Sequence, residues 1–157
     1  MEEGDLHIIE SGLIERERTF RNLKLTKEVL ETKRSIIRWL ALSIGIINPG
    51  ESRLSAVPVL DAIFSFQFIQ KKDPSVQEMQ EYINNSWGTI NEKTLRYHLL
   101  QLKNMGLIDN KKGEYFLVQS EGGERYDEQA WATYYFNSEL DPIKEKVIQV
   151  IKVLKSR

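Results

Sequence analysis

The chain has 157 residues, of which 41% are hydrophobic and 29% charged, and its formal net charge at pH 7 is −1. This is the composition of an ordinary globular domain, and the near-neutral charge argues against a protein that coats nucleic acid without regard to sequence. The absence of cysteine excludes disulfides, thiolate zinc sites and cysteine nucleophiles.

Two stretches bear on location. Residues 1–9, MEEGDLHII, are acidic where a secretory signal would be basic. The longest apolar run, residues 36–47 (IIRWLALSIGII), is interrupted by Arg38 and is shorter than the ~20 residues that a membrane span needs. We therefore expect a cytoplasmic protein that does not use a membrane as a partner.

The N-terminal part, residues 1–50, is predicted to be a helical extension. Residues 5–20 form a weakly amphipathic helix interrupted by Gly12, and residues 25–47 form a long helix with Thr26 as a candidate cap. Asn48-Pro49-Gly50 ends that helix. Its apolar half needs burial, either in the core of the chain itself or against a second copy in a dimer.

Residues 51–120 are predicted to form one module, which begins with two helices. The first starts near Ser55, with Leu54 and Val59 as a hydrophobic staple and Pro58 in its first turn, and it runs to Lys71 and Lys72.

The second helix starts at Asp73-Pro74 or at Ser75, where Glu78 would complete a capping box. It is predicted to turn a set of apolar and aromatic side chains inward: Val76, Met79, Tyr82 and Ile83. The connection over residues 84–89 follows, and Trp87 is expected to pack against the first helix.

Residues 91–105 give the clearest helical pattern. Asn91 is a good N-cap, Thr89 with Glu92 forms a rival capping box, and Gly106 suits a left-handed C-cap. Leu95, Leu99 and Leu102 recur at i, i+4 and i+7, so they share one face of the helix. That face is predicted to be core.

The opposite face of this helix carries the candidate binding residues Lys93, Arg96 and Tyr97. A solvated helix face is the plain alternative. Leu100 lies on the same face and favours a protein-contact surface instead. His98 lies beside the core face and is interpreted as a partly buried structural histidine rather than a metal ligand.

An extended segment follows over residues 107–118. Residues 109–113 supply turn-forming residues, and residues 114–118 (EYFLV) are rich in aromatic and β-branched side chains. We predict a β-hairpin with Lys111 and Lys112 at its tip. From Thr89 to Val118, five basic residues outnumber three acidic ones.

The C-terminal part, residues 121–157, is predicted to form helices that pack on the module or on a dimer partner. One covers residues 121–138; Asp141-Pro142 caps a second, whose apolar side chains form one stripe: Ile143, Val147, Val150, Ile151 and Leu154. Two interpretations stay open for the aromatic cluster, which either lines an effector pocket or packs between helices: Trp131, Tyr134, Tyr135 and Phe136.

The stretch TLRYHLLQLKNMGLI resembles the second half of winged helix-turn-helix domains of the broad ArsR, MarR and PadR type. In that family the pattern is Thr-apolar-x-x-His-Leu, then leucines, then Gly-Leu-Ile and a wing. The matching residues are Thr94, Leu95, His98, Leu99, Leu102, Gly106, Leu107 and Ile108. The resemblance covers about residues 53–126. It departs from the family at the close of the wing, where Gln119 or Ser120 stands in place of the usual threonine.

The resemblance implies a mainly α fold with a small β-hairpin wing and N- and C-terminal helical extensions. It further implies a sequence-specific DNA-binding transcriptional regulator, and we expect a homodimer on double-stranded DNA. The helix over about residues 91–105 would enter the major groove with Lys93, Arg96 and Tyr97 near bases. The wing over about residues 107–118 would place Lys111 and Lys112 on phosphates. The operator, any small-molecule effector and the direction of regulation stay open.

Other function classes compete with this expectation. A winged helix used as a protein-protein interaction module in a transcription or replication assembly is favoured by Leu100 and by the acidic pI of about 6.2. A peripheral membrane protein held by residues 36–47 is a distant third. With two histidines and no HExxH, Walker or nucleophile-elbow motif, the sequence indicates neither an enzyme nor a metal site or cofactor.

Overall fold

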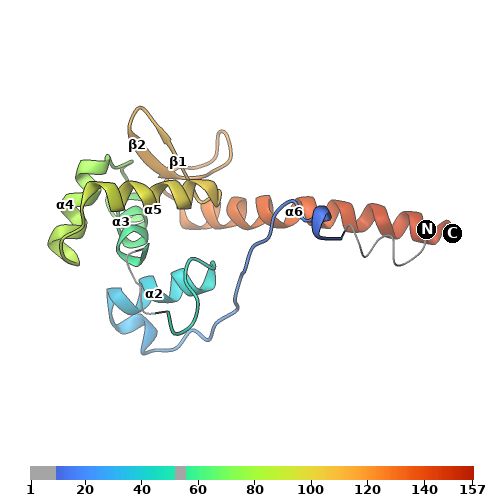
Figure 1. Ribbon diagram of the computed structural model, residues 1–157, viewed down its shortest axis with the longest axis horizontal. Helices are drawn as coiled ribbons and strands as arrows, with labels where there is room; N and C mark the ends of the chain where they lie inside the picture. Colours follow the sequence, from blue (N-terminus) through green and yellow to red (C-terminus); the bar gives the residue numbers. More distant parts are fainter. Residues whose placement is uncertain (1–9, 52–55) are drawn as a thin grey trace. The chain divides into compact units, whose positions relative to one another are not determined.

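The computed structural model describes residues 10–51 and 56–157 (Figure 1). Contacts divide the chain into two compact units, Met1–Leu54 and Ser55–Arg157. Within the described residues the chain is mainly α-helical and carries a small two-stranded antiparallel hairpin. The expected mainly α class with a small hairpin is therefore confirmed at this level.

The first unit contains much less helix than the sequence pattern predicted. Residues 5–9 lie outside the described residues, and the rest of the helix expected up to residue 20 is only the 3-10 turn η1, Glu10–Leu13. The following segment has no regular secondary structure, and its polar groups bond to another element. Arg21 N–H donates to Ser43 O over 2.9 Å, and Trp39 Nε1 donates to Lys24 O over 2.9 Å.

The prediction of one long helix over residues 25–47 is wrong at its N-terminal end. Thr26 Oγ1 accepts from Val29 N and begins only the 3-10 turn η2, Val29–Glu31. Thr32 then adopts an extended conformation and caps the real helix, α2, Lys33–Ser43, by accepting from Ser35 N.

The helix also stops earlier than expected, before Asn48-Pro49-Gly50. Gly45 has φ 77°, and a Cβ there would collide with the carbonyl oxygen of Thr19. The guanidinium of Arg21 donates hydrogen bonds to two backbone carbonyls near this end, to Leu42 O over 2.8 Å and to Ile47 O over 2.9 Å. Four apolar side chains of the run are buried within the single chain, as the core interpretation requires: Ile37, Ala41, Ile44 and Ile47.

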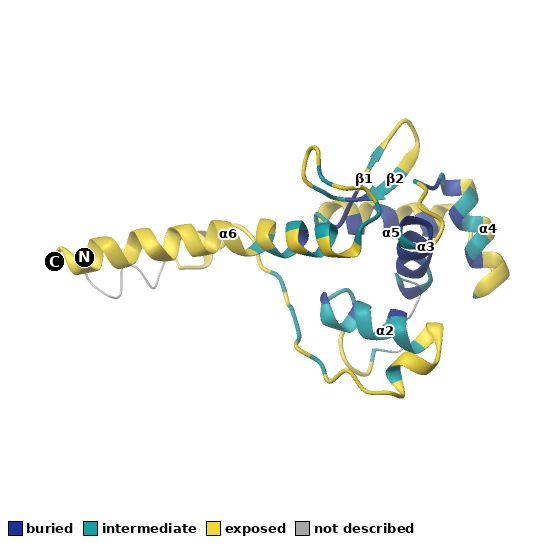
Figure 2. Ribbon diagram, turned by 180° about the vertical axis from the view of Figure 1, so that it is seen from behind, coloured by how far each residue is buried: buried dark blue, intermediate teal, exposed yellow. Residues whose placement is uncertain are grey.

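In the second unit α3, Ala56–Phe68, is the central helix, and it is buried over most of its circumference (Figure 2). Apolar side chains occur all around it, and α4, α5 and β2 contact it. The expected cap Ser55 and staple residue Leu54 lie outside the described residues, while Pro58 stands in the first turn as predicted. The helix does not reach Lys72, because Lys71 adopts a left-handed φ of 53° and turns the chain.

The next helix, α4, Val76–Ser86, begins at the second of its two predicted starts, with Ser75 as the N-cap. Ser75 and Glu78 form a complete capping box. Val76, Met79 and Ile83 are buried, whereas Tyr82 is only partly buried. Since α4 continues through Ser86, the connection to the following helix covers residues 87–91 and not 84–89.

The third helix of this unit, α5, Glu92–Asn104, is capped by Asn91, whose side chain accepts from Thr94 N. It ends at Asn104, and Gly106, two residues later, has φ 78° as the predicted left-handed C-cap requires. The predicted core leucines are buried: Leu95, Leu99 and Leu102.

The hairpin consists of β1, Ile108–Lys111, and β2, Glu114–Leu117, paired antiparallel. Its turn has only two residues, Lys112 and Gly113, and both have positive φ, 53° and 79°. This is the pattern of a type I′ turn, which matches the twist of the paired strands. Lys111 therefore closes a strand rather than lying in the turn.

A single helix, α6, Glu128–Lys155, replaces the two that the sequence predicted. Asp127 caps it, and Pro142 lies inside it instead of starting a new helix. A proline in mid-helix removes one backbone donor, here the one that would bond to the carbonyl of Ser138. The interruption costs one bond and does not end the helix.

The two halves of α6 differ in burial (Figure 2). The first half packs on α3, where Trp131 meets the rings of Phe64 and Phe68 edge-on at centroid distances of 5.2 and 6.0 Å. Residues of the second half are exposed. Within the described residues no helix is long and apolar enough to cross a membrane.

Candidate nucleic-acid interface

The outward face of α5 presents Lys93, Arg96 and Tyr97 together. All three are exposed, and Tyr97 shows 58% of its surface to solvent. They follow one another at i, i+3 and i+4, which places them on one side of the first half of the helix. Leu100, 54% exposed, continues the same face. The sequence-predicted residues of the helix are therefore brought together.

The opposite face of α5 fixes the orientation of this surface. Its leucines are buried, and the helix contacts α3, α4 and β1. Because a helix that is packed on three neighbours cannot rotate freely, the exposed face is held in place by the core.

The turn before α5 is also held by side chains of α4. Gln80 Nε2 donates to the carbonyl oxygen of Ile90 over 2.9 Å, and Asn84 Oδ1 accepts from Ile90 N over 2.9 Å. Both backbone groups of Ile90 are thereby satisfied one residue before the N-cap. The start of α5 is set by these two bonds.

A buried carboxylate anchors the same turn to α3. Asp61 is 1% exposed and accepts hydrogen bonds from Trp87 Nε1 over 2.7 Å, Tyr82 OH over 3.1 Å and Ser65 Oγ over 2.8 Å. The expected packing of Trp87 against the first helix is confirmed through this bond. Sequence reasoning missed Asp61, although an acidic residue in the middle of an apolar helix was a visible signal.

The charges on α5 are partly paired. Arg96 Nε lies 3.3 Å from Glu92 Oε2, one turn earlier, and both side chains are about half exposed. Exposed i,i+4 pairs of this kind contribute only ~0.3–0.5 kcal/mol. The pair orients Arg96 but can be opened at little cost.

The tip of the hairpin carries the other two candidate residues, Lys111 at the end of β1 and Lys112 in the turn. Lys111 and Lys112 are exposed. Within residues 10–51 and 56–157 no ion pair involves either of them or Lys93. Three of the five predicted contact residues are thus lysines without an acidic partner among those residues.

The hairpin is attached to the helices by backbone and side-chain bonds. Tyr115 N donates to Pro74 O over 2.9 Å, which pairs β2 with the segment just before α4. On the inner side, Leu117 N donates over 2.9 Å to Oε1 of Gln67, a buried residue of α3. The hairpin therefore has a fixed position relative to α3.

A cluster of charged and aromatic side chains contacts β2. Arg125 and the hydroxyl of Tyr126 both bond to the carboxylate of Asp73, and Gln67 Nε2 donates to Asp73 Oδ1 over 2.9 Å. The guanidinium of Arg125 lies 5.4 Å from the ring centroid of Phe116. This cluster links β2, the loop before α4 and the loop before α6.

A second contact joins α5 to β1. Lys103 Nζ donates to Asn110 Oδ1 over 2.8 Å and lies 3.6 Å from Asp109 Oδ1. These contacts, with the packing of α5 against β1, connect the last turn of α5 to the hairpin. The helix face and the lysine-bearing tip of the hairpin therefore belong to the same unit.

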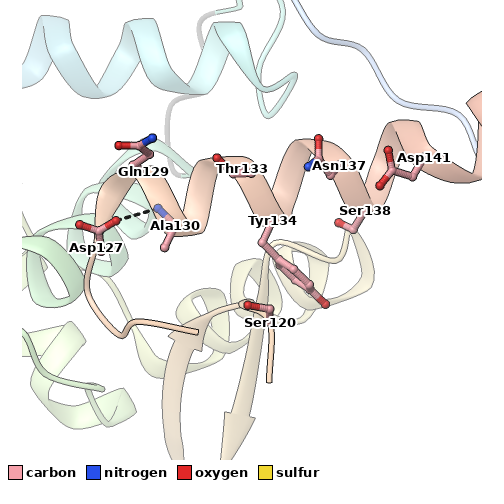
Figure 3. Close-up of a pocket in the computed structure, with 9 residues that line it drawn as sticks. All are labelled: Ser120, Asp127, Gln129, Ala130, Thr133, Tyr134, Asn137, Ser138 and Asp141. Carbon is pink, nitrogen blue, oxygen red and sulfur yellow. Dashed lines mark hydrogen bonds between the residues drawn. The ribbon is translucent and has the colours of Figure 1, made fainter. Parts of the chain in front are cut away.

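The aromatic cluster of α6 is largely a packing element. Trp131 and Tyr135 stack with centroids 5.5 Å apart, and Tyr135 is fully buried. Tyr134 instead lines a shallow hollow beside Ser120 (Figure 3). The other lining side chains are mostly polar and exposed, and one of them, Asp127, already caps α6. The structure favours the packing interpretation for Trp131 and Tyr135.

His98 is partly buried next to Tyr97, with ring centroids 5.3 Å apart. Burial lowers the pKa of its imidazole from the ordinary value of 6.5, because the charged form is poorly solvated there. Among the described residues no group of three or more metal-ligating side chains comes together.

Comparison with known proteins identifies no relative: no protein-family model matches the chain, and neither a curated protein nor a solved structure is significantly similar to it.

Proposed function

We propose that the second unit is a winged helix-turn-helix that binds double-stranded DNA sequence-specifically, and that the protein regulates transcription in the cytoplasm. In this proposal α4 and α5 are the two helices of the motif, and the hairpin is the wing. Lys93, Arg96 and Tyr97 contact bases in the major groove, and Lys111 and Lys112 contact phosphates. The function is binding and requires no metal or cofactor.

One observation carries the proposal. The same unit exposes a basic and aromatic helix face together with two lysines at the tip of the hairpin, while the other side of the same helix is buried. Arg and Lys are the side chains that read guanine edges and neutralise phosphates. A helix of this width fits the major groove.

A protein-binding module is the second candidate. Leu100 and Tyr97 expose a large apolar area on the same face of α5, and Glu92 neutralises Arg96 in part. An apolar and aromatic face of this kind suits a protein partner. The lysines of the turn favour DNA over this alternative.

Selection of bound sequences from a random duplex pool tests the proposal. The full chain is incubated with the pool at low salt, and the bound fraction is sequenced after several rounds. Enrichment of one motif is expected, and its loss with the Arg96→Ala variant would tie the motif to α5. A pool without enrichment would overturn the proposal of sequence-specific binding.

A further inference from the structure

The second half of α6 carries an apolar seam that is left exposed among the residues that the structure describes. Five side chains form it, each between 49% and 68% exposed: Leu140, Ile143, Val147, Val150 and Leu154. Three further apolar side chains, each between 44% and 48% exposed, widen the apolar surface around it: Ile148, Ile151 and Val153. Figure 2 shows this half of the helix exposed along its length. Leaving such a seam in water is unfavourable, so a partner surface is expected.

The spacing of the seam identifies the kind of partner. The five residues follow one another at intervals of three, four, three and four, which is the a/d repeat of a coiled coil. Leu140, Val147 and Leu154 take the a positions, and Ile143 and Val150 the d positions. A seam with this period matches another helix with the same period, and an identical helix satisfies that condition.

The flanking charges distinguish the two possible directions of an identical partner. In a parallel pair, the g position of one helix faces the e position of the next heptad on the other helix. Glu139 at g then faces Lys144 at e of the second copy, and the symmetry provides this attraction twice. Neither antiparallel register that keeps four of the layers offers this attraction. One sets Lys144 opposite Lys144 and Lys146 opposite Lys146, which is repulsive, and the other sets these lysines opposite Ile151 and Val153.

A seam of about two heptads is short for an isolated coiled coil, because helix nucleation is costly. Here the nucleus exists already. The first half of the same 28-residue helix is fixed on α3 through Trp131, so the second half only has to associate.

We propose that the chain forms a homodimer through a parallel, in-register coiled coil of residues 140–154. The proposal does not rest on DNA binding. If both proposals hold, the two α5 helices lie at the same end of the coil and can meet two half-sites of one duplex.

Light scattering on the full chain tests whether the seam joins two copies into a dimer. Wild type is expected to show twice the 18.4 kDa mass of one chain at tens of micromolar. Val147→Glu should give the monomer mass with an unchanged melting temperature of the module, because Val147 is already half exposed. Gln149→Glu adds the same charge outside the seam and should remain dimeric. A monomeric wild type would overturn the proposal.

Charge substitutions and cross-linking test the direction. Glu139→Lys should raise the dimer Kd roughly tenfold, and the double variant Glu139→Lys with Lys144→Glu should restore it. Glu145→Lys, on the outer side of the helix, should leave the Kd unchanged. Because the chain has no cysteine, Leu154→Cys should form a disulfide-linked dimer on mild oxidation, whereas Lys152→Cys should not. A dimer in which Leu154→Cys does not cross-link would contradict the parallel arrangement.

Discussion

Trp87 donates a hydrogen bond from its indole nitrogen to Asp61 Oδ2 over 2.7 Å, and so ties the residue that follows α4 to the middle of α3. The N-cap of α5 comes only four residues later, at Asn91. The position of the α5 face that is proposed to contact DNA therefore depends on a carboxylate that is itself buried in the core.

Asp61→Ala is expected to destabilise the protein strongly. The variant removes the acceptor used by Trp87, Tyr82 and Ser65 inside the core, and the loss should be about 3–5 kcal/mol in the free energy of unfolding. Trp87→Phe removes only one of these bonds and should cost less. Urea denaturation measures both. An Asp61→Ala variant within about 0.5 kcal/mol of wild type would show that the network contributes little.

The two faces of α5 should respond differently to truncation. Leu99→Ala removes buried contacts and should cost ~2–5 kcal/mol, whereas Lys93→Ala on the exposed face should change stability by less than ~0.5 kcal/mol. Thermal melts of the two variants check this. A large destabilisation by Lys93→Ala would mean that the assignment of the faces is wrong.

Glu92→Gln should strengthen DNA binding. The substitution removes a negative charge from the face of α5 that is proposed to contact DNA, and it releases Arg96 from its 3.3 Å pair. We expect severalfold tighter binding with a loss of stability of about 0.3–1 kcal/mol from the first turn of the helix. Titration of a labelled duplex measures the affinity. Weaker binding by this variant would indicate that the pair is needed to orient Arg96.

Lys112 should contribute to DNA affinity only through a contact with a backbone phosphate. Its φ of 53° favours asparagine as a replacement, because asparagine tolerates the left-handed region. Lys112→Asn should weaken binding to every duplex alike and reduce the salt slope by about one unit. Titrations at several salt concentrations test this. A loss confined to one sequence would contradict a phosphate contact.

The stability of the fold should fall as the pH drops below neutrality. Burial holds the pKa of His98 below its ordinary value of 6.5, so the unfolded chain binds the proton more readily than the folded one. The contribution of His98 is complete above that value and is lost as the pH falls through 6.5 toward the folded pKa. Denaturation midpoints of wild type and His98→Gln between pH 8 and 5 measure it. Parallel curves would exclude His98 as the cause.

Local signals predicted much of the second unit. The capping box of Ser75 and Glu78, the cap at Asn91 and the left-handed Gly106 are each fixed by neighbours in sequence, and all occur as predicted. The five candidate contact residues are all exposed, on α5 or at the tip of the hairpin. Whether they touch DNA stays a prediction.

The errors arose where distant contacts outweighed local preference. The helix expected over residues 25–47 stops at Ser43, where Gly45 takes a left-handed φ of 77° and Ile46 N donates to Ala41 O over 2.8 Å. The backbone of Thr19 passes so close to Gly45 that no side chain fits there, and no local pattern reveals that approach. Asp141-Pro142 was expected to start a new helix, but α6 continues through Pro142 and loses only one backbone hydrogen bond there. Asp61 was overlooked because its partners are 4 to 26 residues away.

The most direct test of DNA reading by α5 is a titration of wild type and Arg96→Ala against the selected duplex and a scrambled duplex of equal length. We predict that Arg96→Ala loses ~1–3 kcal/mol on the selected duplex and much less on the scrambled one, so that the two affinities converge. If wild type bound neither duplex at low salt, where phosphate attraction is strongest, the DNA-binding account would be contradicted.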